Sequence, residues 1–226
     1  MASKLINVVT PVGELMHVNI TGQGKENYNE DGYEYVANIR MPAAAAKPLM
    51  DAIEECLGEV PKGKTVKSRG YRELLIDKDE DGNEQLYFPT SKTKESGRDE
   101  KAKKSGIIQF AFKTVTAFPD GKPKKVGVYN SAKPPTKLNM GDKLIGNGSK
   151  GAISGKMQHV ERGKEVMVSL YLNAIQLVDF VEYSGDAGFE GHDDGFTGFS
   201  DDMPEAEAPP SKEEADAPKQ TSKPKL

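Results

Sequence analysis

Residues 58–65, which read GEVPKGKT, match the phosphate-loop pattern G-x-x-x-x-G-K-[ST] at every fixed position. In proteins that hydrolyse nucleoside triphosphates, the backbone amides of such a loop surround the phosphates. Lys64 would then contact the terminal phosphates, and the hydroxyl of Thr65 would hold Mg²⁺. The pattern thus points to one specific reaction, nucleotide hydrolysis, which makes strict demands on the neighbouring elements.

A phosphate loop lies between a buried strand and a helix, because the helix N-terminus must face the phosphates. The sequence around residues 58–65 does not meet this demand. Residues 48–57 have apolar side chains four positions apart, which is typical of a helix, and Gly70 interrupts the chain soon after the motif. Pro61 also removes one amide from the loop. We therefore keep a nucleotide hydrolase as the alternative and not as the expected function.

Other residues that could take part in catalysis or metal binding are scattered along the chain. The histidines His17, His159 and His192 are far apart in the sequence, and Cys56 is the single cysteine. One cysteine cannot form an internal disulfide or a metal cage, which suits a reducing compartment. No serine or cysteine has a histidine and a carboxylate in a recognisable catalytic order. We expect a protein that is not an enzyme and that uses no metal ion or cofactor.

Charged residues are distributed unevenly along the 226-residue chain, whose net charge is −4. Residues 101–150 contain eleven lysines and only two acids, a net charge of +9. Residues 186–226 contain four lysines and eleven acids, a net charge of −7. A charged stretch is often only a solvated surface, but acids this scarce favour a binding face for a polyanion.

Aromatic residues are interleaved with the lysines of the basic block. Flat rings stack on bases of any sequence while lysines follow the phosphate backbone, which is the chemistry of sequence-tolerant single-strand binding. Tyrosines are the favoured stacking residues because their hydroxyl suits a partly wet position, whereas phenylalanines can instead fill a barrel core. The candidate phosphate contacts are Lys113, Lys122, Lys124, Lys125, Lys143 and Lys150, and the stacking candidates are Tyr33, Tyr35, Phe112 and Tyr129.

The hydrophobic pattern predicts many short strands and one helix. Period-two alternation indicates strands over residues 12–20, 33–41, 107–118, 126–130 and 166–172. An Asp81-Gly82 pair predicts a hairpin turn, and residues 89–106 read as a long polar loop. Short strands with frequent turn signals predict a small all-β barrel or sandwich. No apolar run approaches the ~20 residues of a membrane span, so we expect no membrane partner.

The composition changes near residue 185, which predicts a folded domain over residues 1–185 and a separate tail over 186–226. The tail is rich in Gly, Pro, Ala and acids and has few large apolar side chains. We expect it to be disordered, because it cannot bury enough apolar surface to offset ordering. A flexible acidic tail can occupy a basic groove when DNA is absent and can dock on basic, apolar pockets of partners. The candidate docking residues are Phe196, Phe199, Asp201 and Asp202.

A series of segments resembles a known family over roughly residues 10–205, beginning with the IRMP strand end (39–42), the helix that follows it and the acidic DG hairpin. The later segments read FAFKTVTAF (110–118), KVGVYNS (125–131), GDKLIGNGSKG (141–151) and VSLYLNAIQLVDF (168–180), followed by the Gly- and acid-rich tail. Their order is similar to that in phage replication single-stranded-DNA-binding proteins. The resemblance implies a mainly β fold, a five-stranded OB-fold barrel with one α-helix. It also implies a basic DNA groove and an acidic C-terminal tail that masks this groove.

The same resemblance implies a function in phage DNA replication, recombination and repair, in the cytoplasm of a bacterial host. The protein would bind and protect single-stranded DNA without sequence preference. Its tail would recruit replication proteins such as a polymerase or a helicase and primase, and homodimers could form. An RNA-binding OB module stays open as an alternative, because the sequence does not show whether a 2′-hydroxyl is tolerated.

Overall fold

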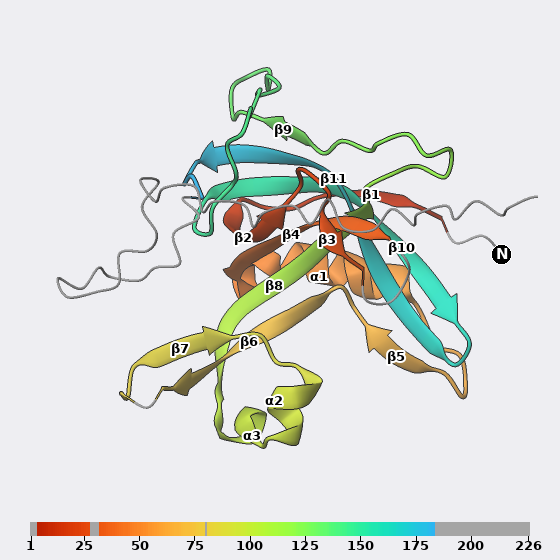
Figure 1. The fold of residues 1–226 in the computed structure, drawn as a ribbon. Coiled ribbons are helices and arrows are strands. Elements are labelled where there is room, and N and C mark those ends of the chain that lie inside the picture. The colour runs from red at the N-terminus through yellow and green to blue at the C-terminus, as the bar shows by residue number, and fades with distance from the viewer. Residues whose placement is uncertain (1–3, 28–31, 80, 184–226) are drawn as a thin grey trace, which may run out of the picture. The chain divides into compact units, whose positions relative to one another are not determined.

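The computed structural model describes residues 4–27, 32–79 and 81–183. These residues are mainly β-structure, and five of the strands close into a barrel (Figure 1). The barrel strands are β2 (Gly13–Asn19), β4 (Tyr33–Pro42), β8 (Lys103–Val115), β10 (Lys150–Arg162) and β11 (Glu165–Asp179). The candidate tail residues Phe196, Phe199, Asp201 and Asp202 lie outside the described residues.

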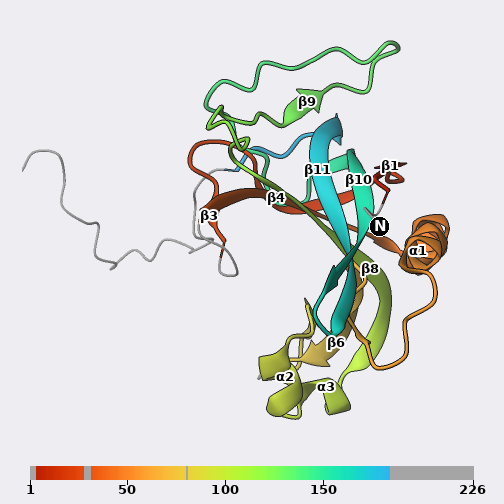
Figure 2. The same cartoon turned by 90° about the vertical axis from the view of Figure 1, so that its right-hand side faces the viewer.

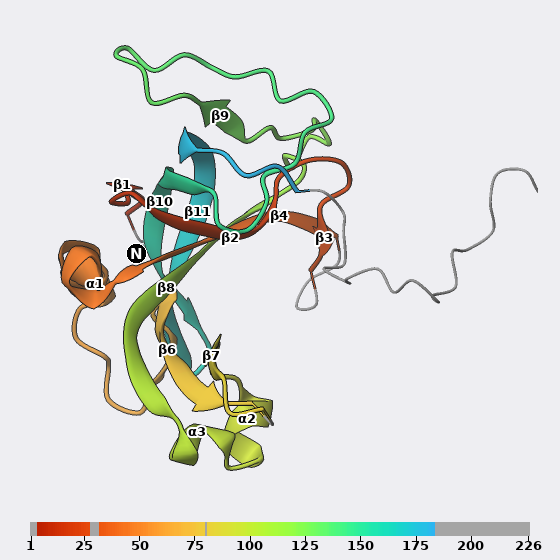
Figure 3. The ribbon, with the colours of Figure 1, turned by 90° about the vertical axis from the view of Figure 1, so that its left-hand side faces the viewer.

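Hydrogen-bonded strand pairs run in a closed circuit around the barrel. Strand β2 pairs with β4, β4 with β8, β8 with β11, β11 with β10, and β10 with β2. Every pair is antiparallel except β8 with β11, which is parallel. Figures 2 and 3 show the same barrel from its two sides. This circuit is an OB-type Greek-key barrel and confirms the predicted fold.

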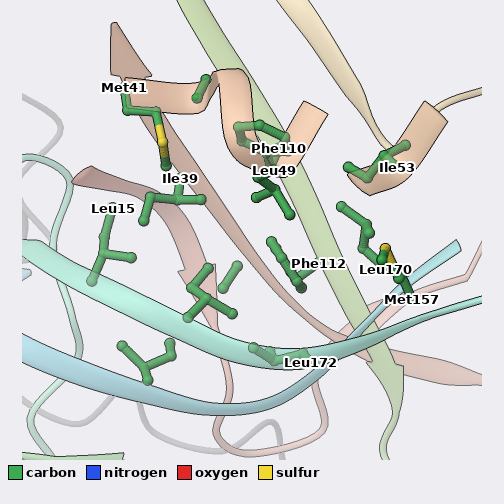
Figure 4. Close-up of a cluster of buried hydrophobic side chains, with 14 of the residues drawn as sticks. Leu15, Ile39, Met41, Leu49, Ile53, Phe110, Phe112, Met157, Leu170 and Leu172 are labelled. Carbon is green, nitrogen blue, oxygen red and sulfur yellow. The ribbon is translucent and has the colours of Figure 1, made fainter. Parts of the chain in front are cut away.

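Alternate residues of the barrel strands fill the core, because successive side chains of a strand point to opposite faces. In β11, Val168, Leu170 and Leu172 are buried while the residues between them are partly exposed. In β8, Phe110 and Phe112 are fully buried. Figure 4 shows these rings and the β11 leucines pointing toward one another inside the barrel.

A β-bulge lets β10 curve around the core. The register of β10 against β11 shifts between Ser154 and Gly155, which is where a bulge bends a strand. A Cβ atom on Gly155 would lie 3.0 Å from the ring of Phe112 and would clash with the carbonyl oxygen of Tyr171. Glycine is therefore required at this position of β10.

Helix α1 (Ala43–Leu57) follows β4 and packs against β4, β8, β10 and β11. Its buried residues include Leu49, Ile53 and Leu57, spaced four apart as the sequence predicts. The helix begins earlier than Pro48, because the preceding alanines have the highest helix propensity. It ends at Gly58, whose amide donates to the carbonyl oxygen of Glu54 at 3.0 Å and whose φ is +63°.

Shorter strands extend the sheet around the barrel. Strand β1 (Ile6–Val9) pairs with β10, β3 (Lys25–Glu26) with β4, and both β5 (Thr65–Ser68) and β9 (Gly127–Tyr129) run parallel to β11. Strands β6 (Tyr71–Lys78) and β7 (Glu84–Tyr87) form the predicted Asp81-Gly82 hairpin, and β6 also pairs with β8. No helix in the described ranges is long and apolar enough to cross a membrane.

The prediction of a long loop over residues 89–106 is wrong. Two short helices, α2 (Ser91–Glu95) and α3 (Arg98–Lys101), occupy its first part, and β8 begins at Lys103. The guanidinium of Arg98 pairs with Asp77 of β6 and lies 4.0 Å from the ring centroid of Tyr87. These long-range contacts hold α3, which is too short to form on local propensity alone, and α2 begins with a local capping box between Thr90 and Thr93.

Candidate nucleic-acid interface

A cleft of about 690 Å³ lies at the end of the barrel that carries β9. Its walls are the end of β2 with the following loop (residues 17–22), the segment that leads into β9 (124–126), and residues within the loop 137–147. In Figures 2 and 3, the long loops around β9 lie at the opposite end of the molecule from α2 and α3. Segments far apart in the sequence thus meet around one cavity.

The charges that line the cleft are all positive. Four lysines line it, and no aspartate or glutamate is among its described lining residues. The lysines are Lys124, Lys125, Lys137 and Lys143. Three of them are sequence candidates, whereas Lys137 is not. Low-dielectric walls with charges of one sign concentrate the field and attract a polyanion, so the cleft suits a phosphate backbone.

Lys124 is the most buried of these lysines. Its Nζ donates to the hydroxyl of Thr114 at the end of β8 and lies 5.7 Å from the ring centroid of Phe118. Burial, and then the charge of Lys156, lower the pKa of Lys124 below its ordinary value. An approaching phosphate would offset both effects, because it supplies the missing negative charge.

His17 marks a strained turn at the edge of the cleft. Its φ is +50°, at the point where the register of β2 against β4 shifts, and its amide donates to Asn147 Oδ1 at 2.7 Å. Burial, and then the charges of Arg40 and Lys25, lower its pKa below the ordinary 6.5. The lowered pKa favours the neutral imidazole, and a phosphate bound nearby would favour its protonated form.

The three tyrosine candidates occupy different positions. Tyr35 lines the cleft but is only 8% exposed, and its hydroxyl donates to the carbonyl oxygen of Gly22 at 3.0 Å. Tyr33 is 41% exposed at the first position of β4. Tyr129 is half-buried in β9, with its ring against Gly127. Only Tyr33 offers a largely open ring, while Tyr35 supports the loop at the cleft wall.

Phe112, like the 8% exposed Tyr35, lies in the buried core, which conflicts with its predicted stacking contact. Its side chain has no exposed surface and packs in the barrel core, as Figure 4 shows. A ring with both faces covered cannot stack on a base. The error arises because both faces of β8 carry plausible residues, and the alternation alone does not say which face is inside.

The remaining lysine candidates lie outside the cleft lining. Lys113 pairs with Glu34 at 3.0 Å across the β4–β8 pair, and Lys122 pairs with Asp120 at 2.9 Å. Lys150 is exposed at the first position of β10. Among the cleft lysines, Lys143 pairs with Glu182 at 2.7 Å. Exposed ion pairs of this kind contribute only about 0–1 kcal/mol, so such lysines can exchange a carboxylate for a phosphate.

The outer face of the barrel carries further candidates that are absent from the sequence-based set. Lys156 of β10 lies opposite Tyr171 of β11, which lies opposite Lys113 of β8. Residues directly opposite across paired strands share a face, so two lysines flank one tyrosine there. Outside the strands, Phe118 is 49% exposed beside Lys124. The alternation of buried residues in 166–172 could have identified Tyr171, because it places that ring outside.

The phosphate-loop segment has the wrong surroundings for triphosphate binding. Residues 58–65 come after α1 and lead into the short strand β5, instead of joining a strand to a helix. Lys64 forms an ion pair with Glu161 of β10, and Lys67 pairs with Glu165 at 2.7 Å. The lysine that would contact phosphate in a hydrolase is thus paired with a carboxylate, and the context required for a phosphate loop is not met.

Comparison with known proteins places the fold. No protein-family model and no curated protein sequence matches the chain. Among solved structures, gp2.5, a single-stranded-DNA-binding protein encoded by bacteriophage T7, aligns with a TM-score of 0.52 and 16% identity. The match covers 88% of this chain and 100% of the solved T7 chain. In its fold, the chain is similar to a phage single-stranded-DNA-binding protein. The single-stranded-DNA-binding protein of bacteriophage Enc34, solved with single-stranded DNA, aligns with a TM-score of 0.45 and 10% identity, over 78% of this chain and 88% of that one.

Proposed function

We propose that this protein binds and protects single-stranded DNA without sequence preference during phage DNA replication and recombination. The observation that carries the proposal is the cleft with four lysines and no described acidic lining residue, at one end of an OB-type barrel. The loop after the first barrel strand is one of the places where OB folds bind oligonucleotides, and residues 20–22 of this loop line the cleft together with the end of β2. The T7 protein with this fold binds single-stranded DNA.

The geometry favours a single strand over a duplex. Bases of a single strand are open to aromatic rings, and every base has a face on which a ring can stack. Tyr33 and Phe118 present open rings, and Tyr171 lies between Lys156 and Lys113 on the outer barrel face. Lysines contact the backbone without reading base edges, so we expect little sequence preference.

The proposal is tested by titrating labelled poly-dT with the full chain at several salt concentrations. We expect tight binding at low salt and a linear fall of log affinity with log salt, because each neutralised phosphate releases counterions. Competition with poly-dA should be nearly as effective as competition with unlabelled poly-dT. No binding at the lowest salt would refute the proposal.

We further propose that the acidic tail masks the cleft and recruits replication proteins such as a polymerase or a helicase and primase. The support is charge complementarity: residues 186–226 have a net charge of −7, and the cleft lining is positive. Replacing Asp193, Asp194, Asp201 and Asp202 by asparagine in the full chain should tighten binding to poly-dT, most strongly at low salt. Unchanged affinity would contradict masking and leave DNA binding intact.

The chemistry of the cleft also fits RNA, since the lysines read phosphates and not sugars. Competition between poly-dT and poly-U separates the two, because only RNA carries the 2′-hydroxyl. Our proposal predicts that poly-dT competes better. A clear preference for poly-U would make the RNA-binding alternative the better description. We also propose that the protein acts in the cytoplasm of the host and forms homodimers.

A further inference from the structure

A second pocket, of about 390 Å³, lies next to the cleft. It is lined by the end of β11 and the residues after it, by residues 130–131, and by residues within the segment 138–143. The two cavities share lining residues in this segment, which therefore separates them as a ridge. The shared residues are Leu138, Asn139, Met140 and Lys143.

The pocket combines apolar walls with a few polar groups. Leu138, Met140 and Leu177 supply apolar surface, and Phe180 at the rim is 37% exposed. Lys143 is its charged residue, and no acid is among its described lining residues. Apolar walls with a few polar groups are typical of small-ligand sites, and aromatic rings together with basic side chains are the combination that binds bases and phosphates.

Two asparagines line the pocket with their side-chain oxygens already engaged. Asn130 Oδ1 accepts from the amides of Ala132 and Thr136 at 3.2 and 2.8 Å. Asn139 Oδ1 accepts from the amide of Gly141 at 3.3 Å. These bonds hold both side chains in place and leave their NH₂ groups able to donate. Carbonyl oxygens of nucleobases are suitable acceptors for such donors.

We propose that this pocket binds one base of the same single strand, so that the strand crosses the ridge 138–143 from the cleft. The base stacks on Phe180, and Lys143 contacts the phosphate between the two cavities. This inference rests on the proposed DNA binding. It extends the binding site to a pocket that is not marked by a lysine-rich stretch of the sequence. Continuity through the shared ridge is what connects the pocket to the cleft.

The size of the pocket favours a base over a protein surface. Its volume falls in the ~300–1,000 Å³ range of small-ligand sites, whereas a stable protein interface needs roughly 800 Å² from each partner. Its charged lining residue is Lys143, which also lines the cleft and would exchange its ion pair with Glu182 for a phosphate. A strand that lies in the cleft is therefore already within reach of the pocket.

The test uses the fact that the chain contains no tryptophan. Phe180→Trp in the full chain places one indole reporter at the pocket, and Leu86→Trp places one at an exposed site in β7 as the control. On titration with poly-dT, we expect the Phe180→Trp variant to lose most of its indole emission at the concentration where bulk binding saturates, because stacked bases quench indole. The emission of the Leu86→Trp variant should change little. Val178→Trp, at another exposed lining position, serves as a second reporter if Phe180→Trp does not fold.

An affinity measurement accompanies the fluorescence experiment. Phe180→Ala should weaken poly-dT binding by at least about fivefold, the lower end for losing one stacked base, and Leu86→Ala should not. Normal DNA binding with unchanged emission at position 180 would overturn the base-binding pocket and leave the proposed function standing. Emission that instead depends on protein concentration without DNA would overturn it in favour of a second copy of the chain. Failure of the wild-type chain to bind poly-dT would refute the proposed function itself.

Discussion

Removal of two exposed lysines from the cleft should weaken DNA binding and reduce its salt dependence. Lys125 and Lys137 both line the cleft and are exposed, and neither forms an ion pair within the described part of the chain. Each lysine that neutralises a phosphate of a single strand adds about 0.7 to the slope of log affinity against log salt. Lys125→Ala/Lys137→Ala should therefore lower that slope by about 1.4. At about 0.1 M salt this corresponds to about fivefold per contact, or about 25-fold for the pair.

The assay is fluorescence anisotropy of labelled oligo-dT at several salt concentrations, with Lys62→Ala/Lys92→Ala as the matched control. The control removes the same charge from exposed positions outside the cleft lining. We expect the control to retain the wild-type slope, because its lysines contact no phosphate. Equal losses in the two double variants would refute the reasoning, since binding would then follow net charge and not the cleft. An unchanged slope in Lys125→Ala/Lys137→Ala would refute it as well.

Three further predictions concern single residues. Phe112→Ala should lower the free energy of unfolding in urea by about 3–5 kcal/mol, because the ring is fully buried. The DNA affinity of the folded variant should stay unchanged, and a specific loss of affinity would restore the stacking role of Phe112. Gly155→Ala should cost about 1–3 kcal/mol in the same assay, since the added Cβ meets the core, and a neutral result would contradict the tight approach. His17 has a pKa lowered from 6.5, so the folded state loses stability as the pH falls from that ordinary value through the lower pKa. Bound phosphate should raise this pKa, so DNA affinity should increase as the pH falls below about 6.5. Measuring the DNA affinity of the wild type and of His17→Gln across this pH range checks the prediction. An equal pH dependence of affinity in the two proteins would contradict it.

The barrel could be predicted from the sequence because its strands and helix carry simple periodic patterns. The alternation of Val168, Leu170 and Leu172 reflects one buried and one partly exposed strand face, and period two is a local property that a sequence displays directly. The four-residue spacing of Leu49 and Ile53 likewise predicts α1, and Gly58 predicts its end.

The short helix α3 could not be predicted, because its stabilising contacts are not local, whereas α2 is capped locally by Thr90 and Thr93. Arg98 has nothing in its own segment that marks it as structural. Its role depends on Asp77 and Tyr87, which come from the β6–β7 hairpin. Very short helices form only where tertiary contacts offset the cost of nucleation. The residues next to Arg98 in the sequence do not indicate such contacts.

The sequence predicts the positive charge of the candidate site but only part of its position in the fold. The lysine-rich block 101–150 does supply the four cleft lysines. The sequence could not show that residues 17–22 face this block, nor that Lys113 is paired with Glu34 while Lys125 is not. Pairing and exposure depend on strand register, and a shift of one residue would reverse every side chain.

The most direct test of the cleft as the DNA site is photo-crosslinking of the full chain to oligonucleotides that contain 5-bromodeoxyuridine, followed by mass spectrometry of the crosslinked peptides. We predict crosslinks in the segments 17–22, 124–126 and 137–147, which line the cleft. Crosslinks confined to α1, or to the hairpin and short helices over residues 71–101, would contradict the account, because those elements do not line the cleft.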